Sequence, residues 1–202
     1  MKKTKIIYHL LVLSLLNCFS TSNFKTGKVL GSNEDGSAQT VFVFGGYNQF
    51  LITPEIMYRS AIDPEQLDMG IKVFPIGIEI DAKYQVLDKY NFSGAGDFGV
   101  TYTSYQSGDA QMKLFTLTPT LLLTYNFTSW FSTTMAPKLM YTMHTKNTEG
   151  SDVKIGDGFS YGVSLTLDIG KWFGVMPEVG LFSTEGITYM TYGAMIRFGG
   201  SQ

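Results

Sequence analysis

The chain has 202 residues, enough for one domain, and its 15 basic and 17 acidic residues give a formal net charge of −2. This balance excludes the basic excess that nucleic-acid-binding proteins carry, so we expect no nucleic-acid partner. One Cys and two His are too few for a metal cluster, and the P-loop, dinucleotide-binding and HExxH motifs are absent. We therefore expect neither a metal nor another cofactor.

Residues 1–17 have the features of a signal peptide. Three lysines precede an apolar stretch over residues 6–16, which is too short to span a bilayer. The Leu-Leu-Asn-Cys sequence that ends at Cys18 resembles a bacterial lipobox. This resemblance implies that Cys18, the only cysteine, is lipidated and becomes the first residue of the mature chain. Asn17 departs from the Gly, Ala or Ser usual at its position, and the alternative is ordinary cleavage near residues 20–22.

The rest of the chain divides into three parts. Residues 18–38 are predicted to be a lipidated N-terminus and a flexible tether, because they are mostly small or polar. A β-barrel is expected over residues 39–199, and residues 200–202 form a short tail.

Alternating apolar and polar residues predict strands through the first half of the barrel. Asp63-Pro64 and residues 75–77 are turn signals. Residues 88–97, which include two glycines, are expected to form a loop, and residues 106–113 a polar connection. The predicted strands cover residues 39–46, 50–60, 68–74, 78–86 and 98–105.

The longest alternation runs over residues 114–145 and predicts a β-hairpin. Every second residue from Phe115 to Phe127 is apolar or aromatic, whereas the residues between them are mostly threonines. Thr128-Ser129 turns the chain, and the same alternation then continues to Thr145. These strands are long enough to cross a membrane, because a tilted transmembrane strand needs about 9–11 residues.

After this hairpin, residues 146–158 are predicted to be the longest polar loop, and strands are predicted over residues 159–169, 173–182 and 187–198. The total is ten strands if residues 75–77 form a turn. An even number is typical of bacterial single-chain barrels, with both termini in the periplasm. Eight strands remain as an alternative if residues 39–59 pair differently.

Three features indicate that the apolar face of this barrel meets lipid. The polar face carries Ser, Thr and Gly rather than Lys and Glu. Aromatic residues gather at strand ends, as in the girdles of membrane barrels. Residues 191–198 match the polar-x-Gly-x-x-hydrophobic-x-aromatic pattern of the β-signal that the outer-membrane insertion machinery reads, with Gly193, Ile196 and Phe198 at its defining positions.

On these features the chain resembles small bacterial outer-membrane β-barrel proteins over residues 39–198. The resemblance implies an all-β fold, a closed antiparallel up-and-down transmembrane β-barrel, located in the bacterial outer membrane with its N-terminus in the periplasm. It implies membrane lipid and the insertion machinery as partners and names no activity. The spaced block from Asp68 to Tyr84, with Gly70, Lys72, Asp81 and Lys83, also resembles a block in uncharacterised outer-membrane lipoproteins.

The same alternation places ten charged side chains on the face of the strands that points into the lumen. Such charges must pair, because an isolated charge in low dielectric is costly. We therefore expect an ion network that fills the lumen, made of Glu55, Arg59, Lys72, Glu79, Asp81, Lys83, Lys138, Asp168, Glu178 and Arg197.

The sequence predicts a structural or surface-interaction role without catalysis, with residues 146–158 as a surface for a ligand. His144 is the only histidine left after processing, and Asp152 and Asp157 follow it, but a lone His at the rim is usually solvated. The alternatives are a periplasmic lipocalin-like ligand-binding barrel, which would hide its apolar face, and a narrow pore.

Overall fold

The structure, a computed structural model, describes residues 25, 28, 40–45, 55–63, 65–107, 110–148 and 151–199. Cys18, the signal peptide and the C-terminal tail lie outside the described residues. Ten strands are described: β1 (Thr40–Gly45), β2 (Glu55–Asp63), β3 (Leu67–Phe74), β4 (Gly77–Lys89), β5 (Phe92–Ser107), β6 (Ala110–Thr128), β7 (Phe131–Thr148), β8 (Ser151–Gly170), β9 (Phe173–Thr184) and β10 (Ile187–Gly199).

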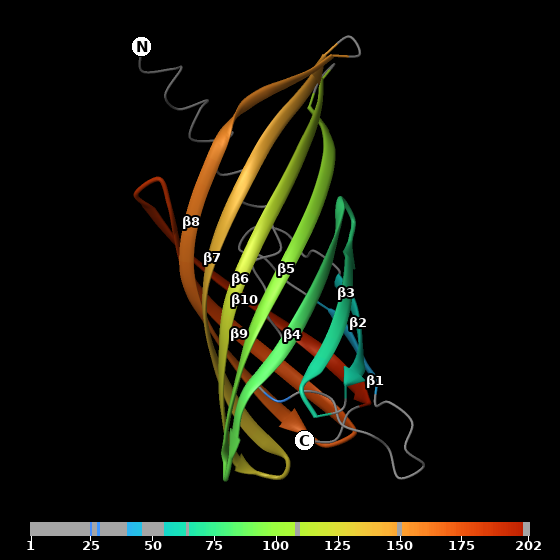
Figure 1. The fold of residues 1–202 in the computed structure, drawn as a ribbon, viewed down its shortest axis with the longest axis vertical. Coiled ribbons are helices and arrows are strands. Elements are labelled where there is room, and N and C mark those ends of the chain that lie inside the picture. The colour runs from blue at the N-terminus through green and yellow to red at the C-terminus, as the bar shows by residue number, and fades with distance from the viewer. Residues whose placement is uncertain are drawn as a thin grey trace.

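Every described strand pairs antiparallel with its neighbour in sequence, which confirms the predicted all-β, up-and-down architecture. The first strand, β1, pairs with β2 and also with β10, so the pairing returns to its start. Figure 1 shows the strands wound around a common axis, with β5 to β8 reaching higher than their neighbours. The described residues include no helix that is long and apolar enough to cross a membrane.

The strands are longer than the sequence predicts at three places. The predicted loop over residues 88–97 is wrong, because only Tyr90 and Asn91 separate β4 from β5. The predicted polar connection over residues 106–113 is likewise mostly strand. Residues 146–158 are not a long loop, since β7 continues to Thr148 and β8 begins at Ser151. Backbone pairing with at least one neighbouring strand keeps these glycine-rich and polar segments extended.

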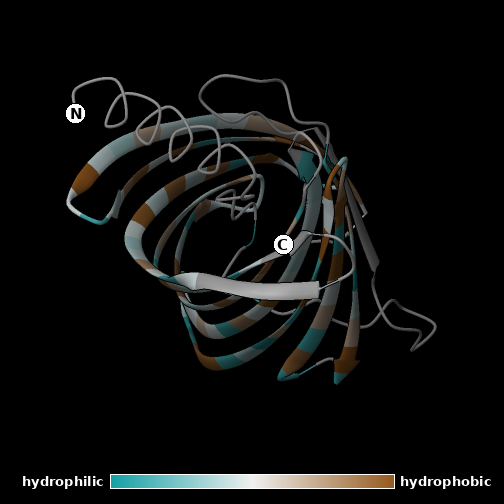
Figure 2. Cartoon of the chain, turned by 90° about the horizontal axis from the view of Figure 1, so that it is seen from above, coloured by the Kyte–Doolittle hydropathy of each residue, from teal (hydrophilic) through white to brown (hydrophobic). Residues whose placement is uncertain are grey.

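The two faces of the strands differ as the alternation predicts. On β6, Phe115 and Leu121 are exposed on the outside, whereas Thr116 and Thr120 are buried inside. Figure 2 shows hydrophobic and hydrophilic residues alternating along the strands when the barrel is seen from above. An apolar exterior with a polar interior is the reverse of a lipocalin-like barrel.

Paired hydroxyl groups occupy much of the interior of the β6–β7 hairpin. The Oγ1 atoms of Thr116 and Thr142 lie 3.0 Å apart, and those of Thr124 and Thr134 lie 2.6 Å apart. Each pair joins directly opposed or nearly opposed residues of the two strands. The threonines thus satisfy one another where an inward polar group would otherwise be costly.

The lower end of the barrel in Figure 1 carries the turns after β4, β6 and β8. Aromatic side chains pack on the outside there: the rings of Phe127 and Phe131 stack with centroids 5.1 Å apart, and Phe198 contacts Phe173 at 5.2 Å. Both tryptophans, Trp130 and Trp172, are exposed at this end. The chain therefore places a band of large rings at one height around the barrel.

Candidate functional site

The most unusual chemistry in the described residues is inside the barrel, where eight charged side chains form one connected set of ion pairs. We call this set the lumenal ion cluster. It joins four strands and one residue of the N-terminal segment, and it consists of Lys25, Arg59, Asp68, Lys72, Glu79, Asp81, Lys83 and Asp97. All eight are buried.

Alternation along β3 and β4 explains how the cluster is built. Asp68 and Lys72 alternate with exposed residues along β3, so both side chains point into the lumen. The side chains of the opposed residues on β4 point the same way. Asp68 opposes Lys83 and Lys72 opposes Glu79 in the register. The corresponding nitrogen–oxygen distances are 2.9 Å and 3.1 Å. The spaced block noted in the sequence therefore encodes a ladder of ion pairs across one hairpin.

Gly70 allows the cluster to extend across β3. It lies opposite Arg59 on β2 and opposite Asp81 on β4, and it faces the lumen. A Cβ atom at Gly70 would lie only 2.6 Å from Nη1 of Arg59 and 2.8 Å from Oδ2 of Asp81. Because glycine has no side chain, Arg59 reaches over β3 and donates hydrogen bonds to both Asp81 and Asp68.

Three members of the cluster, Asp68, Asp97 and Lys25, were missed by the network predicted from the sequence. Asp68 belonged only to the spaced block, and it was not assigned to the lumen. Asp97 lies in the segment predicted to be a loop, and its inward position follows only once β5 is known to begin at Phe92. Lys25 lies in the segment predicted to be a tether. Its Nζ contacts Asp97 at 2.9 Å, Asp81 at 3.1 Å and Glu79 at 3.4 Å. No local pattern could reveal a contact between residues so far apart in the sequence.

A second group of charges lies at the lower end. Arg197 pairs with Asp168 at 3.1 Å, and its guanidinium also donates to the carbonyl oxygens of Lys171 at 2.7 Å and Gly199 at 2.8 Å. These bonds tie β8, the following turn and β10 together. Arg197 therefore fastens the last strand to the end of the barrel from inside.

The other charges predicted to face the lumen are also buried there. Glu178 accepts a hydrogen bond from Thr166, and Glu55 is buried on β2. The Lys138 ammonium lies 5.5 Å from the centroid of the Phe182 ring, a cation–π distance. The alternation in the sequence predicted that Lys138 faces the lumen, but it did not identify this aromatic contact.

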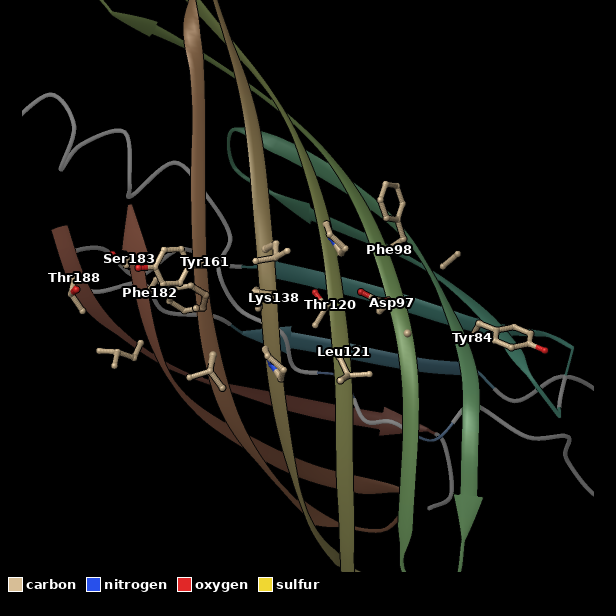
Figure 3. Close-up of a pocket in the computed structure, with 18 residues that line it drawn as sticks. Tyr84, Asp97, Phe98, Thr120, Leu121, Lys138, Tyr161, Phe182, Ser183 and Thr188 are labelled. Carbon is tan, nitrogen blue, oxygen red and sulfur yellow. The ribbon is translucent and has the colours of Figure 1, made fainter. Parts of the chain in front are cut away.

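A cavity of about 1080 Å³ lies next to the cluster at mid-height. Figure 3 shows Asp97, Thr120 and Lys138 on the consecutive strands β5, β6 and β7, with Phe182 on β9. The lining also includes outward-facing residues such as Leu121, so the cavity reaches the barrel wall. It combines an acid, a base and a ring within one space.

The β-signal residues lie on β10 in the orientation predicted. Ile196 and Phe198 are exposed on the outside, Arg197 is buried, and Gly193 is intermediate. Phe198 contacts the ring of Trp172 at 6.3 Å as well as Phe173.

His144 is half-buried near the upper end of β7, beyond Tyr141. Burial lowers the pKa of its imidazole below the usual value, while a backbone hydrogen bond with Gly156 acts in the opposite direction. Asp157 instead accepts a hydrogen bond from the Tyr141 hydroxyl at 2.5 Å. Within the described part of the chain, no group of three or more His, Cys, Asp or Glu residues could hold a metal ion.

Comparison with known proteins gives structural likenesses only. No family model matches the chain, and no curated protein sequence matches it. Among solved structures, Neisserial surface protein A is 11% identical to this chain, with a TM-score of 0.41. The match covers 80% of this chain and 94% of that protein's chain. The Yersinia pestis attachment invasion locus protein Ail, in complex with the heparin analogue sucrose octasulfate, is 10% identical, with a TM-score of 0.45 and coverage of 80% and 99%.

The outer membrane enzyme PagL is also similar in structure, at 12% identity and a TM-score of 0.36, with coverage of 80% and 99%. At such identities and TM-scores, these likenesses transfer no functional residue to this chain.

Proposed function

We propose that this protein is an outer-membrane β-barrel lipoprotein with a structural or surface-interaction role, whose lumen is filled by side chains and which has no catalytic activity. The observation that carries the proposal is the inverted distribution of residues. Large apolar side chains cover the outside of the strands, while buried charges and hydroxyls fill the inside. A water-soluble barrel would lose solubility with such an exterior, whereas a lipid-facing barrel requires it.

The position of the exposed charges supports a membrane band. In the described part of the chain, most exposed charged side chains lie at turns and strand ends, as at Asp63, Lys89, Lys171 and Glu185. Asp157 lies inside β8, where it bonds to the Tyr141 hydroxyl. The outward faces between them carry apolar, hydroxyl or glycine residues. This is the distribution that a hydrocarbon layer selects, since a charge on the lipid face costs about 2–4 kcal/mol at the bilayer midplane.

The height of the apolar band also fits. On β7, the aromatic residues Phe131 and Tyr141 mark the two ends of the outward apolar run. Ten residues at about 3.3 Å each, on a strand tilted by ~40°, span roughly 25 Å along the barrel axis. That is the thickness of the apolar band of outer-membrane barrels. We take residues 131–141 as the spanning part of β7, and His144 lies outside it.

The register supports a closed ten-stranded barrel. When opposed residues are followed from Val41 once around all ten strands, the path returns to β1 about 12 positions further along the sequence. With ten strands about 4.8 Å apart, this stagger corresponds to a tilt of ~40°. Membrane barrels have tilts of about 35–45°.

The same topology supports an orientation. The start of β1 and the end of β10 lie at the lower end, with the turns after β6 and β8. In outer-membrane barrels this end faces the periplasm, which agrees with a lipid anchor at Cys18. The extended β7–β8 hairpin, residues 146–158, then projects outward and offers the surface for a ligand.

Detergent dependence tests the membrane assignment. We expect the protein to be extracted from cell envelopes only by detergent, and its folded form to migrate differently in SDS gels before and after boiling. A protein that is monomeric and soluble without detergent would instead support a periplasmic barrel. Stable unitary currents in planar bilayers would contradict a filled lumen and support a pore.

Labelling of intact cells tests the orientation. Asp152→Cys places a thiol near the start of β8, whereas Ser129→Cys places one in the turn after β6. A membrane-impermeant maleimide should label the first variant on intact cells and the second only after lysis. The opposite pattern would reverse the proposed orientation while leaving the barrel itself intact.

A further inference from the structure

Lys25 is the only described residue outside the strands and turns of the barrel, apart from Lys28, and its ammonium group is enclosed by carboxylates. Three of them surround it, and they come from two adjacent strands: Glu79 and Asp81 on β4, and Asp97 on β5. The Lys25 side chain is only 3% exposed. Three carboxylates around one buried ammonium group form structural ion pairs, and they also have the arrangement of a binding site for a cation.

The charge balance of the lumenal ion cluster requires this ligand. The strands contribute four acids, Asp68, Glu79, Asp81 and Asp97, but only three bases, Arg59, Lys72 and Lys83. Without Lys25, Asp97 loses the one ion pair that it makes among the described residues, and Asp81 and Glu79 each lose one of theirs. Removing one partner of a buried ion pair is costly, so the three carboxylates by themselves form a site that is short of a cation.

The geometry indicates that the site has room for further hydrogen bonding. Oδ1 of Asp97 is buried and has no hydrogen-bond partner among the described residues, although Oδ2 accepts from Lys25. Asp97 also lines the mid-height cavity, so the site opens onto a space of about 1080 Å³. Figure 3 shows Asp97 beside Thr120, which lies opposite it on the adjacent strand β6.

A second contact fixes the same segment. Nζ of Lys83 donates a hydrogen bond to the backbone carbonyl of Lys28 at 2.6 Å. Lys171 is the control for Lys25, since it has the same charge and its side chain is exposed in the turn after β8.

We propose that Glu79, Asp81 and Asp97 form a site for a primary ammonium group inside the barrel, and that Lys25 of the N-terminal segment is its built-in occupant. When Lys25 is shortened, the vacated site binds a free alkylammonium. This inference rests on the filled lumen of the proposed function and adds the identity of the ligand class.

Chemical rescue tests the proposal. Lys25→Ala removes the atoms of a propylammonium ion and leaves its binding groups in place. We expect Lys25→Ala to lower the melting temperature of the protein in detergent by roughly 10 °C, while Lys171→Ala stays close to the wild type. Propylammonium chloride should restore the Lys25→Ala melting temperature in a saturable way, and neutral propanol or sodium chloride at equal ionic strength should not.

A double variant separates charge balance from packing. Lys25→Ala combined with Asp97→Asn removes one base and one acid, so the cluster is balanced again. We expect this variant to melt above Lys25→Ala and to show no response to propylammonium. Propylammonium rescue that sodium chloride matches, or a Lys25→Ala melting temperature equal to that of wild type, would overturn the proposal. Heat-modifiable migration of the same samples shows separately whether the barrel itself has formed.

Discussion

Replacing Arg59 by methionine should destabilise the barrel more than any surface charge change. Met keeps much of the length and apolar volume of Arg but removes the guanidinium that bonds to Asp68 and Asp81. Removing one partner of a buried ion pair typically costs ~3–5 kcal/mol. Asp68 keeps Lys83 at 2.9 Å and Asp81 keeps Lys25 at 3.1 Å, so neither carboxylate loses every cation. We therefore expect a loss of about 3 kcal/mol.

Gly70→Ala tests the same contact without changing any charge. Its new methyl group would meet Nη1 of Arg59 at 2.6 Å, so the guanidinium must move away from Asp81. We expect a loss of about 1–3 kcal/mol, the range typical of overpacking. Lys89→Met is the matched control, because Lys89 is exposed at the end of β4 and its one contact shown among the described residues is a cation–π contact with Tyr90 at 5.6 Å. Its loss should stay below about 1 kcal/mol.

Urea unfolding in detergent micelles measures these differences, with the fluorescence of Trp130 and Trp172 as the signal. Both tryptophans lie on the outer surface at the lower end, away from the substitutions on β2 and β3. If Arg59→Met unfolds within about 0.5 kcal/mol of the wild type, the buried pairs do not hold the lumen together and the reasoning from burial is refuted.

Three further substitutions test other parts of the account. Phe198→Ala should lose roughly 2–3 kcal/mol of apolar transfer free energy and still refold into detergent. It should accumulate poorly in the outer membrane. Normal accumulation in cells would show that β10 is not a targeting signal. Lys138→Ala should destabilise the protein both in detergent and in cells, because it removes a buried ammonium that lies over Phe182, and an unchanged melting temperature would contradict this. Cys18→Ser should abolish acyl labelling and shift the mature N-terminus, whereas an unmodified N-terminus beyond residue 20, found by mass spectrometry, would disprove lipidation.

The sequence predicts the faces of the strands well because alternation is a local property. Phe115 and Thr116 take opposite sides as soon as the backbone is extended, whatever pairs with it. A sheet with an apolar environment on one side and a polar environment on the other repeats this pattern in every strand. The ten inward charges could be predicted for the same reason, since each alternates with apolar residues that face outward.

The ends of the strands could not be predicted in the same way. Residues 88–97 contain glycines, and residues 146–158 are polar, so both segments resemble loops when considered alone. The strands persist there because a neighbouring strand supplies hydrogen-bond partners along each segment. Strand length in a barrel is therefore set by long-range pairing, which propensity does not contain.

Lys25 shows a different limit. A charge in an aperiodic segment has no face, and its partners Asp81 and Asp97 are far away in the sequence. Only the count of charges hints at it, since the strand members of the cluster lack one base. That count becomes meaningful only after the structure shows which charges are neighbours.

The central claim, that the outer surface of the barrel contacts lipid, can be tested with the two tryptophans of the native chain. Trp130 and Trp172 are exposed in the aromatic band at the lower end, where they should lie at the membrane interface. The wild-type protein is folded into vesicles made from lipids brominated either near the headgroup or deep in the acyl chain. We predict strong quenching of tryptophan fluorescence, and more from the shallow bromines than from the deep ones. Fluorescence that neither lipid quenches would show that this surface does not contact the bilayer.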